Sequence, residues 1–319
     1  MKKLLVTEFW GVGDLAIGSA FLKAANREYQ VTLLAKPHAV ELGQILWPKV
    51  KVIPVAAPWT RFRGKYRLHH WPWPTLQKTL RQIRQERPDI AVSARWDPRD
   101  HAVLFLSGAK RRIGFPRKGS QLLLSECLPH VSPDSPRTAQ WNVLGKALEL
   151  TIEQPTPPTR KESGRLAIIH SGAAQPVRIW PITRYASVAS ELRKRGWETT
   201  ILCDPGQVED WKSVKEPALC LANLTELLSY LKKADVFIGN DSGPGHLAAA
   251  LGTPTFTIFG SQRPEWFLPN HLEAGWIEGK TCPYKPCFDY CRFPTPNCLL
   301  ENTTREVTEK LQTWIKNFE

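Results

Sequence analysis

The segment DSGPGH at residues 241–246 has the composition of a loop that binds a diphosphate. It joins a strand-like apolar run, FIGN, to a run of small apolar residues that favours a helix, HLAAAL. Its two glycines allow close backbone approach, and the free N–H groups where a helix begins attract an anion. The aspartate caps the turn or accepts sugar hydroxyls, and the histidine contacts the ligand or is a buried structural residue. The candidate ligand-binding residues are Asp241, Ser242, Gly243, Gly245 and His246.

A second loop, HSGAAQPVRIWP at residues 170–181, follows the strand-like run RLAII. Its glycine and its arginine suit anion binding, because a guanidinium donates two parallel hydrogen bonds to phosphate oxygens. We therefore predict that Ser171 and Arg178 belong to an anion site. The alternative is a surface arginine on an ordinary loop.

A third loop, EFWGVGDLAIG at residues 8–18, places Gly11, Gly13 and Asp14 directly after the first strand-like run. Its spacing is not that of the dinucleotide-binding fingerprint. Because ligands bind beyond the carboxyl ends of parallel strands, Asp14 is a candidate general base. The commoner role of an aspartate at a helix start is to cap the helix, and this is the alternative.

Four of the seven cysteines fall in one short segment, CPYKPCFDYCRFPTPNC. Clustered thiols in a chain of this composition more often bind a metal than form a disulfide framework. The segment lacks paired C-x-x-C motifs, so a structural zinc or iron site and the absence of any metal stand as equal alternatives. The four residues are Cys282, Cys287, Cys291 and Cys298.

The elements that must position these loops are strand-like and helix-like segments that alternate from end to end. This alternation predicts an α/β fold with parallel, nearly continuously apolar strands. TIEQPTPPTRKESG (151–164), which has three prolines and no hydrophobic periodicity, predicts a linker between two domains. Helices are expected near residues 14–28, 75–87, 138–150 and 224–233, after Thr183, and after a capping box of Thr303 and Glu306.

Composition sets the class of protein and of partner. The chain has 319 residues, of which 42% are hydrophobic, and a formal net charge of +13. Nucleic acid is the weakest explanation of that charge, because no nucleic-acid-binding signature accompanies it. Phosphorylated small molecules, an anionic lipid surface and a merely basic surface remain as alternatives.

The stretch APWTRFRGKYRLHHWPWP (57–74) combines tryptophan, arginine and proline. It is either a loop that lies against a membrane interface or a proline-stiffened surface loop whose tryptophans pack on the domain. Neither a secretory signal nor a membrane span is visible in the sequence. We therefore expect a cytoplasmic protein, with peripheral contact at the anionic inner membrane as an extension of that expectation.

Four segments together resemble the heptosyltransferase family (glycosyltransferase family nine), over nearly the whole chain. The most specific of them is GNDSGPGHLAAALGTPTFTIFG at residues 239–260. The loop with a basic residue just before Trp-Pro, HSGAAQPVRIWP, is similar to another family segment. GVGDLAIGSAFLKA and LSGAKRRIGFP complete the resemblance.

The resemblance implies a GT-B fold, which has two Rossmann-like domains with parallel sheets facing across a cleft. Residues 1–155 would form the acceptor-binding domain and residues 164–302 the domain that binds the nucleotide-sugar donor. The last helix, residues 303–319, would pack back towards the N-terminal domain. The resemblance also implies inverting transfer without a metal cofactor, from ADP-heptose to a lipopolysaccharide-core saccharide.

Site residues follow from the same resemblance. Asp14 matches the catalytic base, and Arg178 stands where the family has a lysine that contacts donor phosphate. The other donor-site matches are Ser171, Glu209 (for the ribose), Asp241, Ser242, Gly243, Gly245 and His246. The acceptor-side candidates are Gly13, in the loop that carries Asp14, and Arg61 and Arg63, in a region that matches the family less closely.

The expected partners are a nucleotide-diphosphate sugar and a lipid-linked or phosphorylated saccharide acceptor. Other enzymatic interpretations are a GT-B transferase that uses another nucleotide sugar or a protein acceptor, and a sugar-nucleotide epimerase. A non-catalytic sugar-nucleotide-binding protein is the alternative from a different class. The presence of Asp14 argues against that last interpretation.

Overall fold

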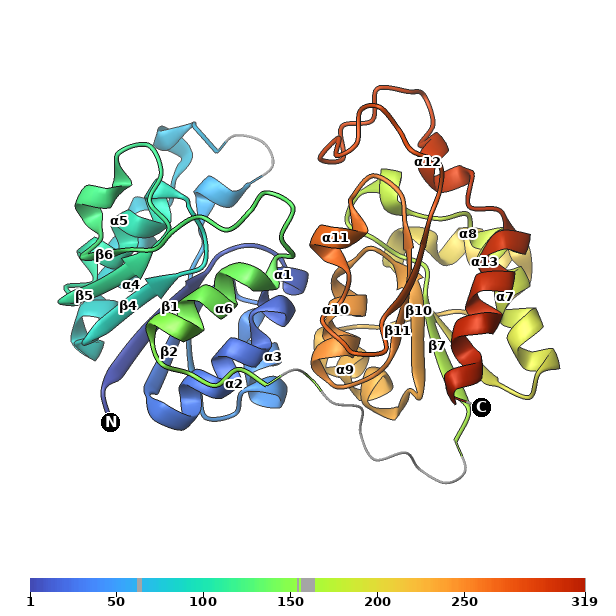
Figure 1. The fold of residues 1–319 in the computed structure, drawn as a ribbon, viewed down its shortest axis with the longest axis horizontal. Helices are drawn as coiled ribbons and strands as arrows, with labels where there is room; N and C mark the ends of the chain where they lie inside the picture. The colour runs from blue at the N-terminus through green and yellow to red at the C-terminus, as the bar shows by residue number, and fades with distance from the viewer. Residues whose placement is uncertain (62–64, 154, 156–163, 319) are drawn as a thin grey trace. The chain divides into compact units, whose positions relative to one another are not determined.

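Two six-stranded sheets, each with all of its paired strands parallel, organise the chain. They are seen in a computed structural model that describes residues 1–61, 65–153, 155 and 164–318. One sheet lies in the unit of residues 1–153 and the other in the unit of residues 154–319 (Figure 1). The predicted linker, residues 151–164, falls largely outside the described residues.

The first unit begins with the strand that carries the Asp14 loop. Its strands are β1 (Lys3–Glu8), β2 (Gln30–Ala35), β3 (Lys51–Pro54), β4 (Ile90–Ser93), β5 (Arg111–Gly114) and β6 (Glu126–Cys127). Its α-helices are α1 (Val12–Ile17), α2 (Ser19–Glu28), α3 (Ala39–Leu46), α4 (Trp73–Glu86), α5 (Pro98–Leu106) and α6 (Thr138–Ala147). Because side chains alternate between the faces of a strand, the almost complete burial of β1 requires cover on both faces of the sheet, and helices flank it in Figure 1.

The helix expected near residues 14–28 is two helices, and the expectation of one is wrong. The chain breaks at Gly18, which separates α1 from α2. A Cβ on Gly18 would lie 2.9 Å from the Trp141 ring of α6, so only glycine fits at this close approach. The packing partner comes from far along the chain, and the local sequence pattern does not contain it.

The second unit repeats the architecture. Its strands are β7 (Leu166–His170), β8 (Glu198–Cys203), β9 (Leu219–Cys220), β10 (Val236–Asn240), β11 (Thr255–Phe259) and β12 (Gly275–Glu278). Its α-helices are α7 (Ile182–Lys194), α8 (Val208–Val214), α9 (Leu224–Lys233), α10 (Gly243–Ala250), α11 (Pro264–Phe267), α12 (Asn297–Leu300) and α13 (Thr304–Ile315). The predicted bounds of α9 and the capping box that opens α13 are confirmed.

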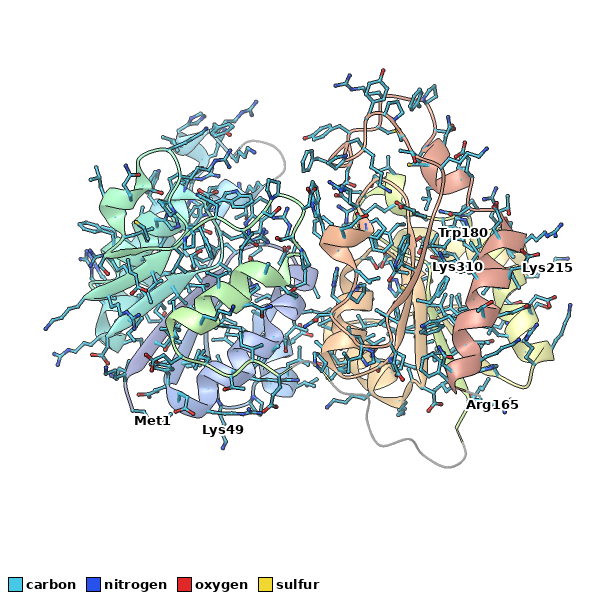
Figure 2. The ribbon with its side chains drawn as sticks, in the orientation of Figure 1. Met1, Lys49, Arg165, Trp180, Lys215 and Lys310 are labelled. Carbon is cyan, nitrogen blue, oxygen red and sulfur yellow. The ribbon has the colours of Figure 1, made fainter. Side chains whose placement is uncertain are left out.

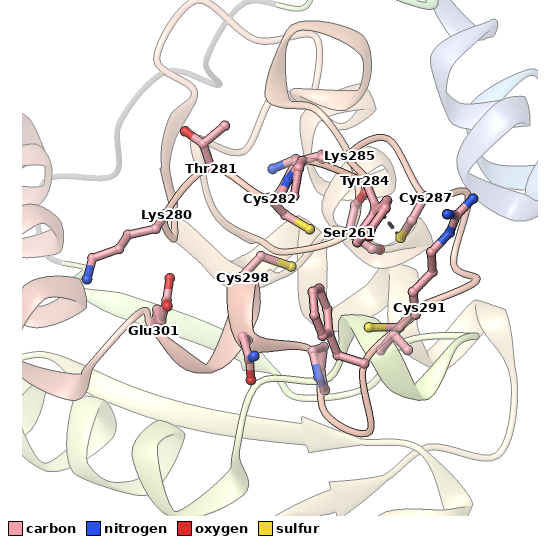
Figure 3. A pocket seen from close by; sticks show the side chains of 16 residues that line it. Ser261, Lys280, Thr281, Cys282, Tyr284, Lys285, Cys287, Cys291, Cys298 and Glu301 are labelled. Carbon is pink, nitrogen blue, oxygen red and sulfur yellow. Dashed lines mark hydrogen bonds between the residues drawn. The ribbon is translucent and has the colours of Figure 1, made fainter.

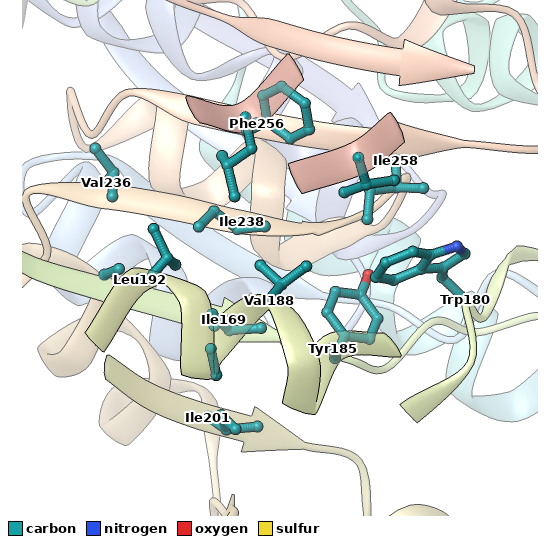
Figure 4. Packing of buried hydrophobic residues seen from close by; sticks show 14 of the residues in the cluster. Ile169, Trp180, Tyr185, Val188, Leu192, Ile201, Val236, Ile238, Phe256 and Ile258 are labelled. Atoms are coloured by element: carbon teal, nitrogen blue, oxygen red, sulfur yellow. The ribbon is translucent and has the colours of Figure 1, made fainter. Parts of the chain in front are cut away.

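One face of the second sheet packs against α7 and α13. Val188 and Leu192 of α7 meet Ile169 and Ile238 of the sheet in one buried cluster (Figure 4). Trp180, which Figure 2 labels, is fully buried in the same cluster and meets the Tyr185 ring edge-on at 5.0 Å. Helix α13 packs against α7 and β12, so its apolar face is used within the second unit.

Strand order explains where ligands can bind. The first sheet has the order β3-β2-β1-β4-β5-β6 and the second β12-β11-β10-β7-β8-β9. In each, the chain leaves the first strand in one direction and later returns to its other side. The loops after β1 and β4, and those after β7 and β10, therefore diverge and leave space at the carboxyl edge, as in other doubly wound sheets.

Asn240, the last residue of β10, fixes the loops at this edge of the second sheet. Its side-chain oxygen accepts hydrogen bonds from the Trp180 backbone N–H at 3.0 Å and the Tyr185 hydroxyl at 2.9 Å. Its amide nitrogen donates to the carbonyl oxygen of Ser171 at 2.7 Å. One buried side chain thus ties the loop after β7 to the loop after β10.

Among the described residues, none of the helices has the length and apolar composition that a bilayer span requires.

Candidate active site

The carboxyl edge of the first sheet brings three charged side chains together. Glu8 ends β1, Asp14 lies in the first turn of α1, and Arg95 follows β4. The Arg95 guanidinium donates a hydrogen bond to Asp14 Oδ1, and its Nε lies 3.4 Å from Glu8 Oε2. The arginine therefore lies between two carboxylates at the β1–β4 switch point.

Asp14 is held in one orientation from two sides. It is at the third helical position of α1, and its Oδ2 accepts a hydrogen bond from the Gly11 backbone N–H at 3.1 Å. It thus has the role of the acidic partner in a capping box and not of the N-cap itself. Burial alone would raise the pKa of Asp14, but the Arg95 charge and the hydrogen bonds from Gly11 and Arg95 outweigh burial and hold it below the usual value.

Cations outnumber carboxylates around Asp14. Lys36, which follows β2, and Arg137, which precedes α6, both interact electrostatically with Asp14 and Glu8. Burial lowers the pKa of Lys36 and of Arg137, and it raises the pKa of Glu8. With Arg95 these residues form a partly buried basic site that suits a ligand with negative groups. Sequence reasoning missed Glu8, Lys36, Arg95 and Arg137, because their loops meet only in the folded sheet.

Asp100, in the first turn of α5, is a second buried carboxyl of this unit. It is fully buried, its Oδ1 accepts a hydrogen bond from Trp59 Nε1 at 2.9 Å, and its Oδ2 has no hydrogen-bond partner among the described residues. Burial, with a smaller effect of the nearby Asp97, raises the pKa of Asp100 to about 8. The carboxyl is therefore mostly protonated at neutral pH.

Of the predicted acceptor-side residues, one lies beside Asp14 and the other two lie elsewhere in the sequence. Gly13 is within α1, next to Asp14. Arg61 is exposed directly after the short 3₁₀ turn Pro58–Thr60. Arg63 lies outside the described residues.

The carboxyl edge of the second sheet places an arginine between two carboxylates as well. Arg178, in the loop after β7, donates from Nη1 to Asp241 Oδ2 at 3.1 Å, and Asp241 follows β10. Its Nε and Nη2 donate in parallel to the two oxygens of Asp289, at 2.8 and 2.6 Å. Arg178 and Asp241, each predicted separately as a donor-site residue, are thus brought together, and Asp289 is a partner that sequence reasoning missed.

Asp289 occupies an anion site. Its Oδ1 also accepts hydrogen bonds from Ser261 Oγ at 2.8 Å and Gln262 Nε2 at 3.2 Å, both in the segment after β11. Burial alone would raise the pKa of Asp289, but Arg178, Ser261 and Gln262 hold it below the usual value. Side chains from the loops after β7 and β11 therefore converge on one carboxylate, which has the charge and the planar oxygen pair of an anionic ligand.

Helix α10 begins at the same edge with the predicted glycine loop. Ser242 is its N-cap, but the serine side chain makes no capping hydrogen bond, and its Oγ has no hydrogen-bond partner among the described residues. The helix starts at Gly243, continues through Gly245, and buries His246 in its first turn. The N–H groups of Ser242, Gly243 and Gly245 have no acceptor within the helix, and Pro244 has no N–H, so the α10 N-terminus is electropositive.

Two predicted donor-site residues have structural partners. The Ser171 hydroxyl is buried, donates to Gln207 at 3.0 Å and accepts from Trp211 Nε1 at 3.0 Å. Glu209 is in the first turn of α8, where its side chain is 82% exposed and pairs with Lys212. Ser171 therefore stabilises the loop after β7 through these buried hydrogen bonds, and the Glu209 side chain faces solvent.

The four clustered cysteines line one pocket of about 240 Å³ (Figure 3). The thiols of Cys282 and Cys298 point toward the same part of it, and those of Cys287 and Cys291 lie apart from them (Figure 3). All four are free thiols. Within the part of the chain that is described, no group of three or more His, Cys, Asp or Glu side chains is arranged to hold a metal ion, so of the two alternatives the zinc or iron site has no support from the structure.

Comparison with known proteins adds sequence relatives to this geometry. The family profile described as glycosyltransferase family 9 (heptosyltransferase) matches residues 134–294. The lipopolysaccharide heptosyltransferase 1 of Campylobacter coli is 35% identical over 106 residues, which are 30% of this chain and 31% of that protein. The chain thus matches this relative over about a third of the relative's length.

Solved structures match the whole chain. A glycosyltransferase family 9 protein from Veillonella parvula has a TM-score of 0.78 at 17% identity, covering 99% of this chain and 98% of that one. Two structures of the E. coli heptosyltransferase WaaC, one with ADP and one with ADP-2-deoxy-2-fluoro heptose, have TM-scores of 0.74 and 0.73 at 16% identity. Each covers 98% of this chain and 99% of that one. The predicted α/β fold of the GT-B class is confirmed.

The opposite environments of Asp97 and Asp100 on one helix predict opposite dependences of stability on pH. The folded-state pKa of Asp100 lies above its unfolded value, so the folded protein binds more protons between about pH 4 and pH 8, and Asp100 destabilises the fold increasingly as pH rises. Asp100→Asn should therefore stabilise α5, relative to the wild type, more at pH 8 than at pH 5. The difference should exceed about 1.4 kcal/mol, the free energy that corresponds to one pKa unit. Hydrogen exchange of α5 amides, corrected for intrinsic rates, measures this.

Asp97→Asn is the matched control. Asp97 is the N-cap of α5, and its hydrogen bonds with Arg99 hold its pKa below the usual value, so its stabilising effect is present above the unfolded pKa and lost only in acid. This variant should be weakened equally at pH 5 and pH 8. A pH dependence for Asp100→Asn that parallels the wild type would contradict the protonated state of Asp100.

Proposed function

The chain belongs to glycosyltransferase family 9, and from that premise we propose that it transfers a heptose from ADP-heptose to a lipopolysaccharide-core saccharide or a related acceptor. The chain is a glycosyltransferase by its family. ADP and an ADP-heptose analogue bound to the structurally similar WaaC support the choice of donor. The observation that carries the proposal is Asp14, an oriented and ionised carboxylate at the carboxyl edge of the first sheet.

In the proposed reaction the first unit activates the acceptor. Asp14 accepts the proton of an acceptor hydroxyl as its oxygen attacks the anomeric carbon of the donor. The bond from that carbon to the diphosphate oxygen breaks, ADP leaves with the bonding electrons, and the configuration at the carbon inverts. Lys36, Arg95 and Arg137 near Asp14 support an acceptor that carries negative groups, such as phosphorylated core sugars.

The second unit is proposed to bind the donor. Arg178 and the N–H groups of the first turn of α10 would stabilise the diphosphate, on which negative charge develops as the sugar is transferred. We propose that these groups supply the stabilisation without a metal ion. Asp241 accepts a hydrogen bond from Arg178, and through this contact it would orient the Arg178 side chain toward the phosphates.

Donor binding must then change the partners of Arg178. Both outer edges of its guanidinium are occupied, one by Asp241 and one by the bidentate contact with Asp289. A diphosphate that takes the place of the Asp289 carboxylate would inherit the same donors, including Ser261 and Gln262. We propose that Asp289 occupies the phosphate position in the empty enzyme and leaves it when the donor binds.

Asp14→Asn tests the proposed base. Asparagine keeps the size of the side chain and can still accept a hydrogen bond from Gly11, but it cannot accept the proton of the acceptor. We expect kcat to fall about 10²- to 10⁴-fold, with the Kd for ADP nearly unchanged. The matched control is Glu126→Gln, which removes a carboxylate that pairs with Arg111 in the same unit and should leave kcat unchanged. Near wild-type transfer by Asp14→Asn would reduce Asp14 to a helix cap.

Arg178→Ala and Asp289→Asn should move ADP affinity in opposite directions. Loss of the guanidinium should weaken ADP binding about tenfold to 150-fold, the range for charge-assisted hydrogen bonds of about 1.5–3 kcal/mol. Loss of the competing charge in Asp289→Asn should tighten it about threefold or more. Isothermal titration of the full chain with ADP measures both. Weaker binding by Asp289→Asn would mean that Asp289 positions Arg178 for the donor, and unchanged binding by Arg178→Ala would remove Arg178 from the donor site.

A further inference from the structure

An apolar pocket of about 300 Å³ lies in the first unit, and none of the charged residues around Asp14 that are named above lines it. It is enclosed by α4, α5 and the aromatic segment that precedes α4, and its walls are almost entirely hydrocarbon and aromatic ring. The residues that form most of the wall are Trp59, Trp71, Trp73, Leu76, Leu80 and Val103. Nothing in the proposed transfer of a sugar uses such a cavity, since sugars and phosphates need polar partners.

The mouth of the pocket is apolar as well. Trp73 is 47% exposed and Leu106 is 41% exposed, and both line the pocket. Phe105 and Leu68 are exposed nearby in sequence. Trp71 lines the wall, and its buried indole N–H has no hydrogen-bond partner among the described residues. Tryptophan at an apolar surface with a polar rim is typical of a membrane interface.

The segment around the pocket is strongly basic. Between residues 57 and 87 the sequence has eight arginines and lysines and a single acidic residue, Glu86. Three of the basic residues, Lys78, Arg81 and Arg84, are exposed on α4, whose Leu76, Leu80 and Ile83 face the pocket. Helix α4 is therefore amphipathic, with an apolar side toward the cavity and basic residues on its exposed surface.

We propose that this pocket receives a hydrocarbon chain of an anionic membrane lipid, whose phosphate is held by the exposed basic residues of α4, Lys78, Arg81 and Arg84. Apolar walls fit a hydrocarbon chain, and the cationic surroundings fit a phosphate at its end. A second copy of the chain is a poor occupant, because it would bring an equally basic surface against this one. The inference concerns how the protein reaches a membrane, and it does not depend on the sugar or the donor.

Vesicle binding of the full chain tests the charge requirement. Wild-type protein should sediment with vesicles of phosphatidylcholine that contain about 30% phosphatidylglycerol, and not with phosphatidylcholine alone. Each basic residue at an anionic surface contributes about fivefold in affinity, so the double variant Lys78→Glu, Arg81→Glu should bind at least about tenfold more weakly. The matched control Lys232→Glu, Lys233→Glu makes the same charge change in the last turn of α9 and should bind as the wild type does.

Phosphatidylglycerol with brominated acyl chains tests the pocket itself, because bromine quenches tryptophan fluorescence at contact. We expect quenching in the wild type and its reduction by more than half in Leu80→Gln, which makes the wall polar. Leu106→Gln, at the exposed rim, serves if circular dichroism shows that Leu80→Gln does not fold. Equal binding to both vesicle types overturns the proposal. Charge-dependent binding with no effect of Leu80→Gln or Leu106→Gln on quenching also overturns it, because the lipid would then attract the protein surface without entering the pocket. A dimer that either of these variants dissociates overturns it as well, because a second copy of the chain would then fill the pocket.

Discussion

Charge pairing at the carboxyl edge of each parallel sheet is the interaction on which the candidate site of each unit depends. Arg95 in the first unit and Arg178 in the second each lie between two carboxylates. A fully buried carboxylate without such a partner takes up a proton, as the raised pKa of Asp100 illustrates within the first unit. The arginines therefore keep Asp14 and Asp289 ionised, whereas burial still raises the pKa of Glu8 beside Arg95. The strand order decides where those arginines lie, because it opens the edge only beside β1 and β7.

The two pairings have different consequences for chemistry. Asp14 is kept ionised and oriented, so it is available as a base at neutral pH, although its low pKa makes it a weak one. The charge of Arg178 is balanced by Asp241 and Asp289, and in the proposed mechanism a ligand replaces Asp289. In such ion pairs the groups that would contact a ligand are already desolvated and already oriented. This reduces the entropy that is lost when the ligand binds. Asn240 contributes to this order by fixing the loop that leads to Arg178.

The sequence predicted those parts of the molecule that local patterns determine. Apolar strands, the capping box at Thr303 and the bounds of α9 depend on neighbours within a few residues, and they are confirmed. The strand pairs β5–β6 and β8–β9 include two-residue edge strands, too short for a periodic signal. The break at Gly18 and the contact of Asp289 with Arg178 arise from residues far apart in the chain. No local pattern encodes such contacts, so the loops of the site were predictable and their internal pairing was not.

The most direct test of the central claim, that Asp14 is held ionised and accepts the proton of the acceptor, is the single-turnover rate of sugar transfer from ADP-heptose between pH 5 and pH 8. Because Arg95 holds the pKa of Asp14 below its usual value, the carboxylate stays ionised over this range, and the rate should be constant within about twofold. A rate that rises about tenfold per pH unit, with a midpoint between pH 6 and pH 7, would contradict the account. The base would then be a group of raised pKa, such as the buried Glu8.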